Sequence, residues 1–222
     1  MKKILPIALL AIPAALVAAP AANWVSRVAM TPIGGHYVGN PAAPTKLTEY
    51  VSYTCSHCAH FVKEASAPLR ADYIKGGKVG VEVRNAVRDK YDLTAALLAR
   101  CGGPARFIGN HEALFANQDA WMPRIEAYDA DGAAKPADQV AALKDIGQKT
   151  GLYTLMGKRG FKPAQLDACI ANPQSMKQVL AMTDEAWNKV KISGTPGFTV
   201  NGTLVKGSTW DILKAALPAP AR

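Results

Sequence analysis

The chain has 222 residues, of which 49% are hydrophobic and 19% are charged, and its formal net charge is +9. This balance is typical of a folded globular protein and excludes a disordered chain. The basic residues are not gathered with aromatic residues into the kind of cluster that nucleic acids need. We therefore expect a solubilising surface charge and no nucleic-acid partner.

Residues 1–22 have the composition of an export signal. Lys2 and Lys3 form a positively charged start, residues 4–17 are apolar, and small residues follow at 18–22. The apolar run is shorter than the ~20 residues that a membrane-spanning helix needs, although an uncleaved anchor is the alternative. We predict a signal peptide and an exported protein, in which cysteines form redox centres or disulfides more often than metal sites.

Residues 23–91 predict strands around one long helix. Residues 23–44 are rich in turn-forming residues and are predicted to be a linker with one short strand. The expected elements are strand 36–38, strand 45–52, helix 55–74 and strand 78–83. Pro68 falls inside the helix and should kink it, because proline lacks the N–H that a helical hydrogen bond needs.

Beyond residue 91 the pattern becomes helical and then returns to strands. The expected helices begin near Leu93, span Phe107 to Phe115, and cover 138–147, 163–171 and 176–191, with a loop at 129–136. Strands at 198–200 and 204–205 flank Asn201-Gly202, which is a strong hairpin signal. A helix at 210–217 and a flexible tail at 218–222 close the chain. The order predicts an α/β domain, 45–91 with 192–217, that contains an inserted helical domain, 92–191.

Cys55-Ser56-His57-Cys58 lies where the strand 45–52 leads into the first helix. Helical spacing of three residues places both thiols on one side, close enough to form a disulfide. The unpaired N–H groups and the positive dipole of the first turn should lower the pKa of Cys55. His57 can add positive charge or a hydrogen bond to the thiolate. We predict a dithiol/disulfide centre that exchanges with other proteins.

Zinc sites use the same spacing, so a metal-binding or copper-delivery module remains an alternative. It would use Cys55 and Cys58 with either His57 or His60. No second Cys-x-x-Cys is present to complete a four-cysteine site, and residue 59 is alanine, which excludes the Cys-x-x-Cys-His pattern of haem attachment. We expect no metal and no cofactor.

Thr195-Pro196 stands directly before the terminal hairpin, at the entrance to a strand where proline is disfavoured. A cis peptide bond would accommodate the proline, since cis bonds occur essentially only before proline. An ordinary trans proline in a turn is the alternative. The presence of Cys-x-x-Cys in the same chain favours the cis form.

Together these motifs resemble the DsbA-like thiol:disulfide oxidoreductases of the bacterial periplasm, within the thioredoxin superfamily. The resemblance covers roughly residues 34–217. It rests on Gly39-Asn-Pro41, the run from Glu49 to Cys58, the inserted helices, Phe115-Ala-Asn-Gln118, and Gly194-Thr-Pro-Gly-Phe198 before Asn201-Gly202. It implies an α/β, thioredoxin-like fold with an inserted helical domain.

The resemblance also implies roles for individual residues. Cys55 would be the exposed nucleophile and Cys58 the buried resolving thiol. Pro196 would be cis and lie against the disulfide, and the Thr195 backbone would pair with bound peptide as a strand. Glu49 occupies the position of a buried acid that relays a proton to Cys58, and a surface strand acid is the alternative.

By this resemblance the chain is a periplasmic enzyme that donates the Cys55–Cys58 disulfide to newly exported proteins with free cysteines. A membrane redox partner would re-oxidise it, and we expect a monomer. Many family members have Pro-His between the cysteines, whereas this chain has Ser56-His57. Because these residues tune the thiolate, a periplasmic reductase or an isomerase using the same dithiol remains an alternative. A pure chaperone that does not need Cys55 is a further alternative.

Cys101 and Cys169 form a second pair in the helical region. In an oxidising compartment we expect a structural disulfide between them. Two buried free thiols or a second exchange site are the alternatives. A bond that closes so long a loop adds ~4 kcal/mol in the chain-entropy model.

Overall fold

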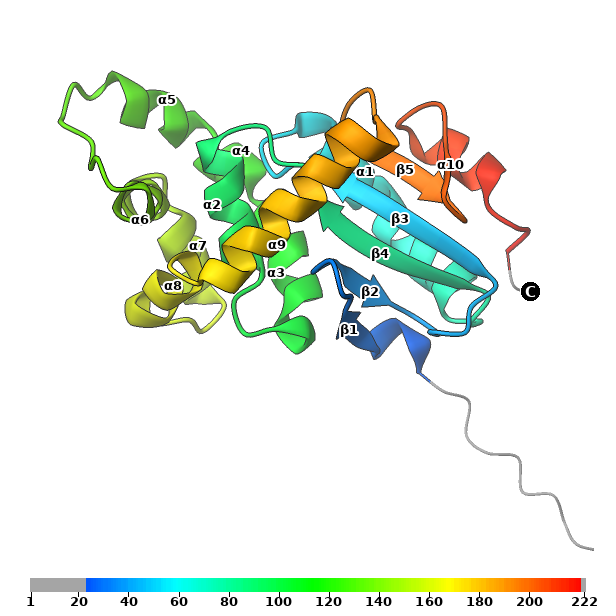
Figure 1. The fold of residues 1–222 in the computed structure, drawn as a ribbon. Coiled ribbons are helices and arrows are strands. Elements are labelled where there is room, and N and C mark those ends of the chain that lie inside the picture. Colours follow the sequence, from blue (N-terminus) through cyan, green and yellow to red (C-terminus); the bar gives the residue numbers. More distant parts are fainter. Residues whose placement is uncertain (1–22, 221–222) are drawn as a thin grey trace, which may run out of the picture.

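The computed structural model describes residues 23–220. The predicted signal peptide and the last two residues lie outside this range. Six strands form one mixed sheet in the order β1-β2-β4-β3-β5-β6 (Figure 1). Their bounds are β1 Val28–Met30, β2 His36–Val38, β3 Thr45–Val51, β4 Val79–Asn85, β5 Gly197–Val200 and β6 Thr203–Leu204.

The strand that precedes the Cys-x-x-Cys, β3, lies in the middle of the sheet. It pairs in parallel with β4, where Leu47 faces Val81, and antiparallel with β5, where Leu47 faces Val200. Both neighbouring strands, β4 and β5, carry apolar and β-branched side chains, which favour strands in a buried sheet. The end of β3 is therefore held from both sides, which places the residues that follow it at a fixed edge.

The helix after β3 begins one residue later than predicted. α1 covers Ser56–Pro68, with Cys55 in extended conformation as its N-cap. The chain then continues as a π-helical turn, η2 (Leu69–Ile74), in which Lys75 N–H donates to Arg70 O at 3.0 Å. Pro68, which has no N–H to donate, stands where the α-helical pattern ends.

The inserted region contains eight α-helices between β4 and β5. These are α2 Lys90–Ala99, α3 Pro104–Ala116, α4 Gln118–Trp121, α5 Pro123–Ala130, α6 Gln139–Lys149, α7 Leu152–Lys158, α8 Pro163–Ile170 and α9 Pro173–Asp184, the last extended by the π-helical η3 Glu185–Val190. In Figure 1, α9 returns from α8 toward the sheet, and α5 to α8 lie away from it. A final helix, α10 (Trp210–Ala216), follows β6.

Several sequence predictions need correction. The segment 23–44 is more than a linker with one strand, since it also holds β1 and a 3-10 turn, η1 (Trp24–Ser26). The helical region begins at Lys90 rather than 92, because Asp89 caps α2 by accepting from the N–H groups of Tyr91 and Asp92. The predicted loop 129–136 starts later, because α5 continues to Ala130.

Short helices and helix ends account for the remaining differences. α4, α5 and α7 were not predicted as elements, and α9 begins at Pro173 rather than 176. α5 and α9 both start with a proline at the first helical position, a start signal that periodicity alone does not include. The limits of the two domains stay predictions, since one cluster of buried side chains includes residues from both.

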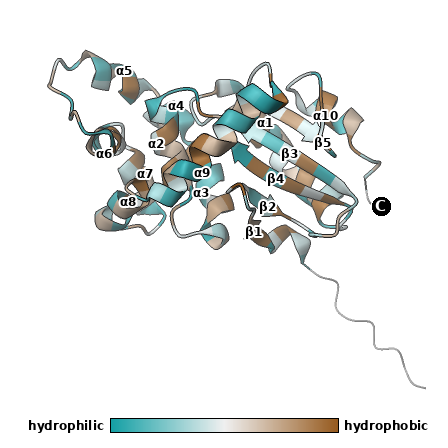
Figure 2. Ribbon diagram, viewed as in Figure 1, coloured by the Kyte–Doolittle hydropathy of each residue, from teal (hydrophilic) through white to brown (hydrophobic). Residues whose placement is uncertain are grey.

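β3, β4 and α9 each carry both hydrophobic and hydrophilic residues (Figure 2). For α9 this is the pattern of an amphipathic helix that covers one face of a sheet. The terminal hairpin turns at Asn201-Gly202, both with positive φ, as the sequence predicts. Within residues 23–220, no helix has the length and apolar character needed to cross a bilayer.

Candidate active site

The two cysteines of the motif meet at the start of α1, directly after β3. Both are free thiols, so the structure describes the reduced form. Cys58 is fully buried in the first turn, and Cys55 is 4% exposed. The expectation of an exposed nucleophile is therefore wrong for the resting dithiol. Cys55 is covered because its Sγ packs against the Thr195 carbonyl, to which it donates at 3.1 Å.

The environment of Cys55 stabilises its thiolate. Its pKa is lowered to about 4, chiefly by a hydrogen bond from the Cys58 thiol, with further contributions from Thr195, the Cys58 N–H and the charge of Arg88, against the opposing effect of burial. Among the residues that the structure describes, the Thr195 hydroxyl has no hydrogen-bond partner in the thiol form. It is thus free to donate to Cys55 once the proton has left.

Cys58 behaves in the opposite way. Burial raises its pKa well above the ordinary value, and its hydrogen bond to Cys55 and the nearby charge of Glu49 add to the shift. At neutral pH the pair therefore holds one thiolate, on Cys55, and one thiol, on Cys58. This asymmetry suits Cys55 to act as the nucleophile and Cys58 as the resolving thiol, the roles that the family resemblance implies.

The loop before β5 completes the site from the far end of the chain. The Thr195–Pro196 peptide bond is cis, and Thr195 is 9% exposed beside the Cys55 sulfur. β5 is anchored by its pairing with β3, where Glu49 faces Phe198. The sheet therefore brings together two segments that are 140 residues apart in the chain.

Glu49 is a buried acid rather than a surface one. It is 4% exposed, and within the described part of the chain its Oε1 has no hydrogen-bond partner. Burial raises the pKa of the carboxyl to about 8, so Glu49 is largely protonated at neutral pH. When Glu49 ionises, its charge raises the pKa of Cys58, so the two groups interact.

His57 is exposed, and no hydrogen bond from its ring is recorded in the part of the chain that the structure describes. Its predicted contribution to the thiolate stays a prediction. His60 is exposed as well and lies 3.6 Å from Glu64 on the next turn. Across residues 23–220, no group of three or more histidine, cysteine or acidic side chains is arranged to hold a metal.

A polar network that the sequence did not suggest holds the loop between β3 and α1. Arg88 donates to Ser52 at 2.9 Å and to Thr54 at 3.1 Å. The buried Asp92 accepts from the Tyr53 N–H at 2.7 Å. Arg88 and Asp92 follow the end of β4. Because β3 and β4 are parallel, this end lies at the same edge of the sheet as the end of β3. That parallel pairing is the signal that could have indicated these residues.

Gln118 links the helical region to the motif. Its Nε2 donates to the carbonyl oxygens of Tyr53 at 2.8 Å and of Cys55 at 3.1 Å. Gln118 ends the stretch Phe115-Ala-Asn-Gln118 that carries part of the family resemblance, but the sequence assigned it no role. The structure makes it a positioning residue for the turn that presents Cys55.

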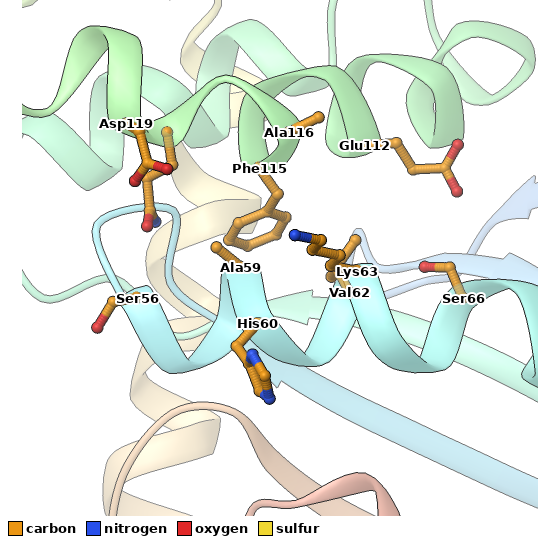
Figure 3. Close-up of a pocket in the computed structure, with 11 residues that line it drawn as sticks. Ser56, Ala59, His60, Val62, Lys63, Ser66, Glu112, Phe115, Ala116 and Asp119 are labelled. Carbon is orange, nitrogen blue, oxygen red and sulfur yellow. The ribbon is translucent and has the colours of Figure 1, made fainter.

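A groove of about 540 Å³ opens beside the motif, between α1 and the α3–α4 segment. Figure 3 shows Phe115 pointing toward Ala59 on α1, with Lys63 beside it and Ser56 at one end. The floor is apolar, while His60, Lys63, Glu112 and Asp119 supply charged or ionisable groups. Ser56, the neighbour of Cys55, is one of the residues that line the groove, so the groove reaches the motif.

Cys101 and Cys169 are joined by a disulfide with a Cα–Cα distance of 5.6 Å. The bond links the end of α2 to α8 across 68 residues of sequence. The predicted pairing is confirmed, and the two thiols are not free in this structure.

Comparison with known proteins agrees with this site. A family model described as thioredoxin matches residues 31–219. The chain belongs to the thioredoxin family. It is also similar to the crystal structure of a protein-disulfide isomerase from Novosphingobium aromaticivorans, with 35% identity and a TM-score of 0.75, over 82% of this chain and 94% of that one.

Curated relatives and a more distant structure are also similar to this chain. A protein of Rickettsia felis with protein-disulfide oxidoreductase in its name is 29% identical over 81% of this chain. The chain spans about 58% of that relative's length. The alpha-DsbA1 structure of Wolbachia pipientis shares the fold, with 21% identity and a TM-score of 0.67, over 84% of this chain and 90% of that one. The predicted membership of the thioredoxin superfamily and the thioredoxin-like fold are confirmed.

Proposed function

We propose that this protein is an exported thiol:disulfide oxidoreductase that donates the Cys55–Cys58 disulfide to client proteins with free cysteines. The observation that carries the proposal is the opposite pKa shift of the two thiols, to about 4 for Cys55 and upward for Cys58. A stabilised Cys55 thiolate stabilises the reduced form, which makes the corresponding disulfide more oxidising.

The reaction starts from the oxidised enzyme. A client thiolate attacks the Cys55 sulfur, the Cys55–Cys58 bond breaks, and Cys58 leaves with the electron pair and takes up a proton. Glu49 is the nearby acid that can supply this proton, since it is largely protonated at neutral pH. A second client thiolate then attacks the client sulfur of the mixed disulfide and releases Cys55 as a thiolate. The client loses two electrons and the enzyme gains them.

Clients are held next to Cys55 by two surfaces. The backbone at Thr195, in the loop before β5, pairs with an extended client segment in strand fashion. The groove between α1 and α3 has room for neighbouring client side chains. Newly exported chains suit both surfaces, because their backbones are still unpaired. A membrane redox partner returns the enzyme to its oxidised form, and the periplasm is the compartment that we propose.

An isomerase is the second candidate, because the Novosphingobium structure with 35% identity carries that name. The reduction potential separates the two. The protein is equilibrated in graded glutathione buffers, quenched with acid and alkylated, and each thiol is located by mass spectrometry. A potential well above about −180 mV supports the oxidase, a value near about −180 mV with disulfide reshuffling supports the isomerase, and about −270 mV points to a reductase.

A further inference from the structure

Arg100, at the end of α2, is a buried arginine without an acidic partner. It is 8% exposed. Its Nη1 donates to the Gly34 carbonyl at 2.7 Å, and its Nη2 donates to Gln178 Oε1 and approaches Met30 Sδ at 3.5 Å. Its Nε has no hydrogen-bond partner among residues 23–220. Among the ion pairs formed by residues 23–220, none includes Arg100.

This charge is not neutralised by the ionisable groups around it. An arginine keeps its proton in proteins, and a buried charge without a counter-charge is costly. His36 is neutral, because burial and the charge of Arg100 lower its pKa to about 3. Tyr53 is neutral as well, because burial raises its pKa well above the ordinary value. The guanidinium therefore has only neutral partners.

The guanidinium borders a pocket of about 310 Å³. Two of its neutral partners, Met30 and Gln178, line the same pocket. The lining contains amide, hydroxyl and backbone groups but no aspartate or glutamate. It consists of Met30, His36, Leu97, Arg100, Gly102, Gly103, Pro104, Cys169, Asn172, Gln174, Ser175 and Gln178. Arg100 is the one charged side chain of this set.

Two helix N-termini add positive potential to the pocket. α3, of 13 residues, begins at Pro104 without a side-chain cap, after Gly103 with φ of 72°. α9, of 12 residues, begins at Pro173 after its cap Asn172. The N-terminal ends of helices favour anions through their dipoles and unpaired N–H groups. The N-termini of α3 and α9 and the Arg100 guanidinium therefore all contribute positive potential to this pocket.

We propose that this pocket binds a small oxyanion, a phosphate or carboxylate group, that neutralises Arg100. The amides of Asn172, Gln174 and Gln178 and the Ser175 hydroxyl provide hydrogen bonds for its oxygen atoms. None of the lining residues belongs to the Cys55–Cys58 site. The proposal is therefore independent of the disulfide chemistry and concerns a second site of the protein.

The probes are inorganic phosphate and succinate, each compared with sodium chloride at matched ionic strength. Thermal unfolding and calorimetry are measured on the purified protein. Phosphate, succinate or both raise Tm with concentration beyond the effect of chloride. A response to phosphate alone identifies a phosphate group as the ligand, and a response to succinate identifies a carboxylate. Equal Tm values in all three salts overturn the proposal.

Gln178→Glu supplies a permanent counter-charge at the position that already accepts from Arg100. We expect this variant to have a higher Tm in chloride and at least a tenfold weaker affinity for the responding anion. Gln148→Glu, at an exposed position of α6, changes the net charge equally and keeps the wild-type response. Arg100→Met removes the response where it folds. Equal anion affinity in Gln178→Glu and Gln148→Glu also overturns the proposal.

Discussion

The two cysteine pairs in this chain differ in their structural environment, and this difference determines which pair is reactive and which is structural. Cys55 and Cys58 are free thiols in one helical turn, whereas Cys101 and Cys169 are joined across 68 residues between α2 and α8. The first pair has one thiolate stabilised by hydrogen bonds and one thiol kept protonated by burial. The second pair has its sulfur atoms already bonded and closes a long loop.

The difference lies in what each bond stabilises. A disulfide within one turn restricts the unfolded chain little, so the hydrogen bonds around its thiolate dominate its energetics. A bond across a long loop restricts the unfolded chain strongly and favours the folded state. The first pair is thus suited to donate its bond, and the second is suited to keep it.

The largest effect is expected from Cys55→Ser. Disulfide transfer to a reduced, unfolded client should be lost, because no mixed disulfide can form. The measurement is the rate of client oxidation, with Cys101→Ser/Cys169→Ser as the control that keeps this rate. Retained transfer in Cys55→Ser would contradict the role of Cys55 as the nucleophile.

Cys101→Ser/Cys169→Ser should lose up to about 4 kcal/mol of unfolding free energy, by the loop-closure estimate. Denaturant unfolding of this variant and of the wild type measures the loss. The reduction potential of Cys55–Cys58 should not change, because the second pair does not contact the first. A shifted potential would mean that the two pairs are coupled.

Glu49→Gln should remove a pH dependence of stability. The Glu49 pKa rises from an ordinary 4.5 to about 8 on folding, so the unfolded chain loses this proton first as pH rises. Its stabilising effect is therefore complete below about pH 4.5 and is lost as pH approaches 8, at about 1.4 kcal/mol for each pKa unit. Between these pH values, the free energy of unfolding should decline less steeply with rising pH in Glu49→Gln than in the wild type. An unchanged slope would exclude a raised pKa.

Gln118→Leu is expected to have the smallest effect. It leaves the carbonyl oxygens of Tyr53 and Cys55 without their amide donor, at a cost of about 1–3 kcal/mol. Faster hydrogen exchange in residues 53–56, with the Cys101–Cys169 bond intact, is the expected signature. Gln148→Leu, exposed on α6, is the matched control. Equal exchange in both variants would show that Gln118 does not position the motif.

The sequence was sufficient for what depends on local pattern. The strand–Cys-x-x-Cys–helix order and the Asn201-Gly202 turn could be predicted in this way. The long-range pairing of Cys101 with Cys169 was predicted on another ground, because they are the two cysteines that remain in a chain expected to be exported. What it did not predict depends on distant segments. Gln118 and Arg88 contact the loop after β3 only because the fold brings α4 and the end of β4 to one edge. The low exposure of Cys55 likewise depends on Thr195.

The position of Thr195 in the chain also affects when Cys55 becomes reactive. The carbonyl and hydroxyl of Thr195 reach Cys55 only after β5 has paired with β3, and β5 starts at residue 197. A chain that emerges from its amino-terminal end therefore presents its Cys-x-x-Cys long before these groups are in place. The part of the thiolate stabilisation that Thr195 contributes therefore arrives only after the loop before β5 has been made and placed, later than the part that comes from the neighbouring Cys58.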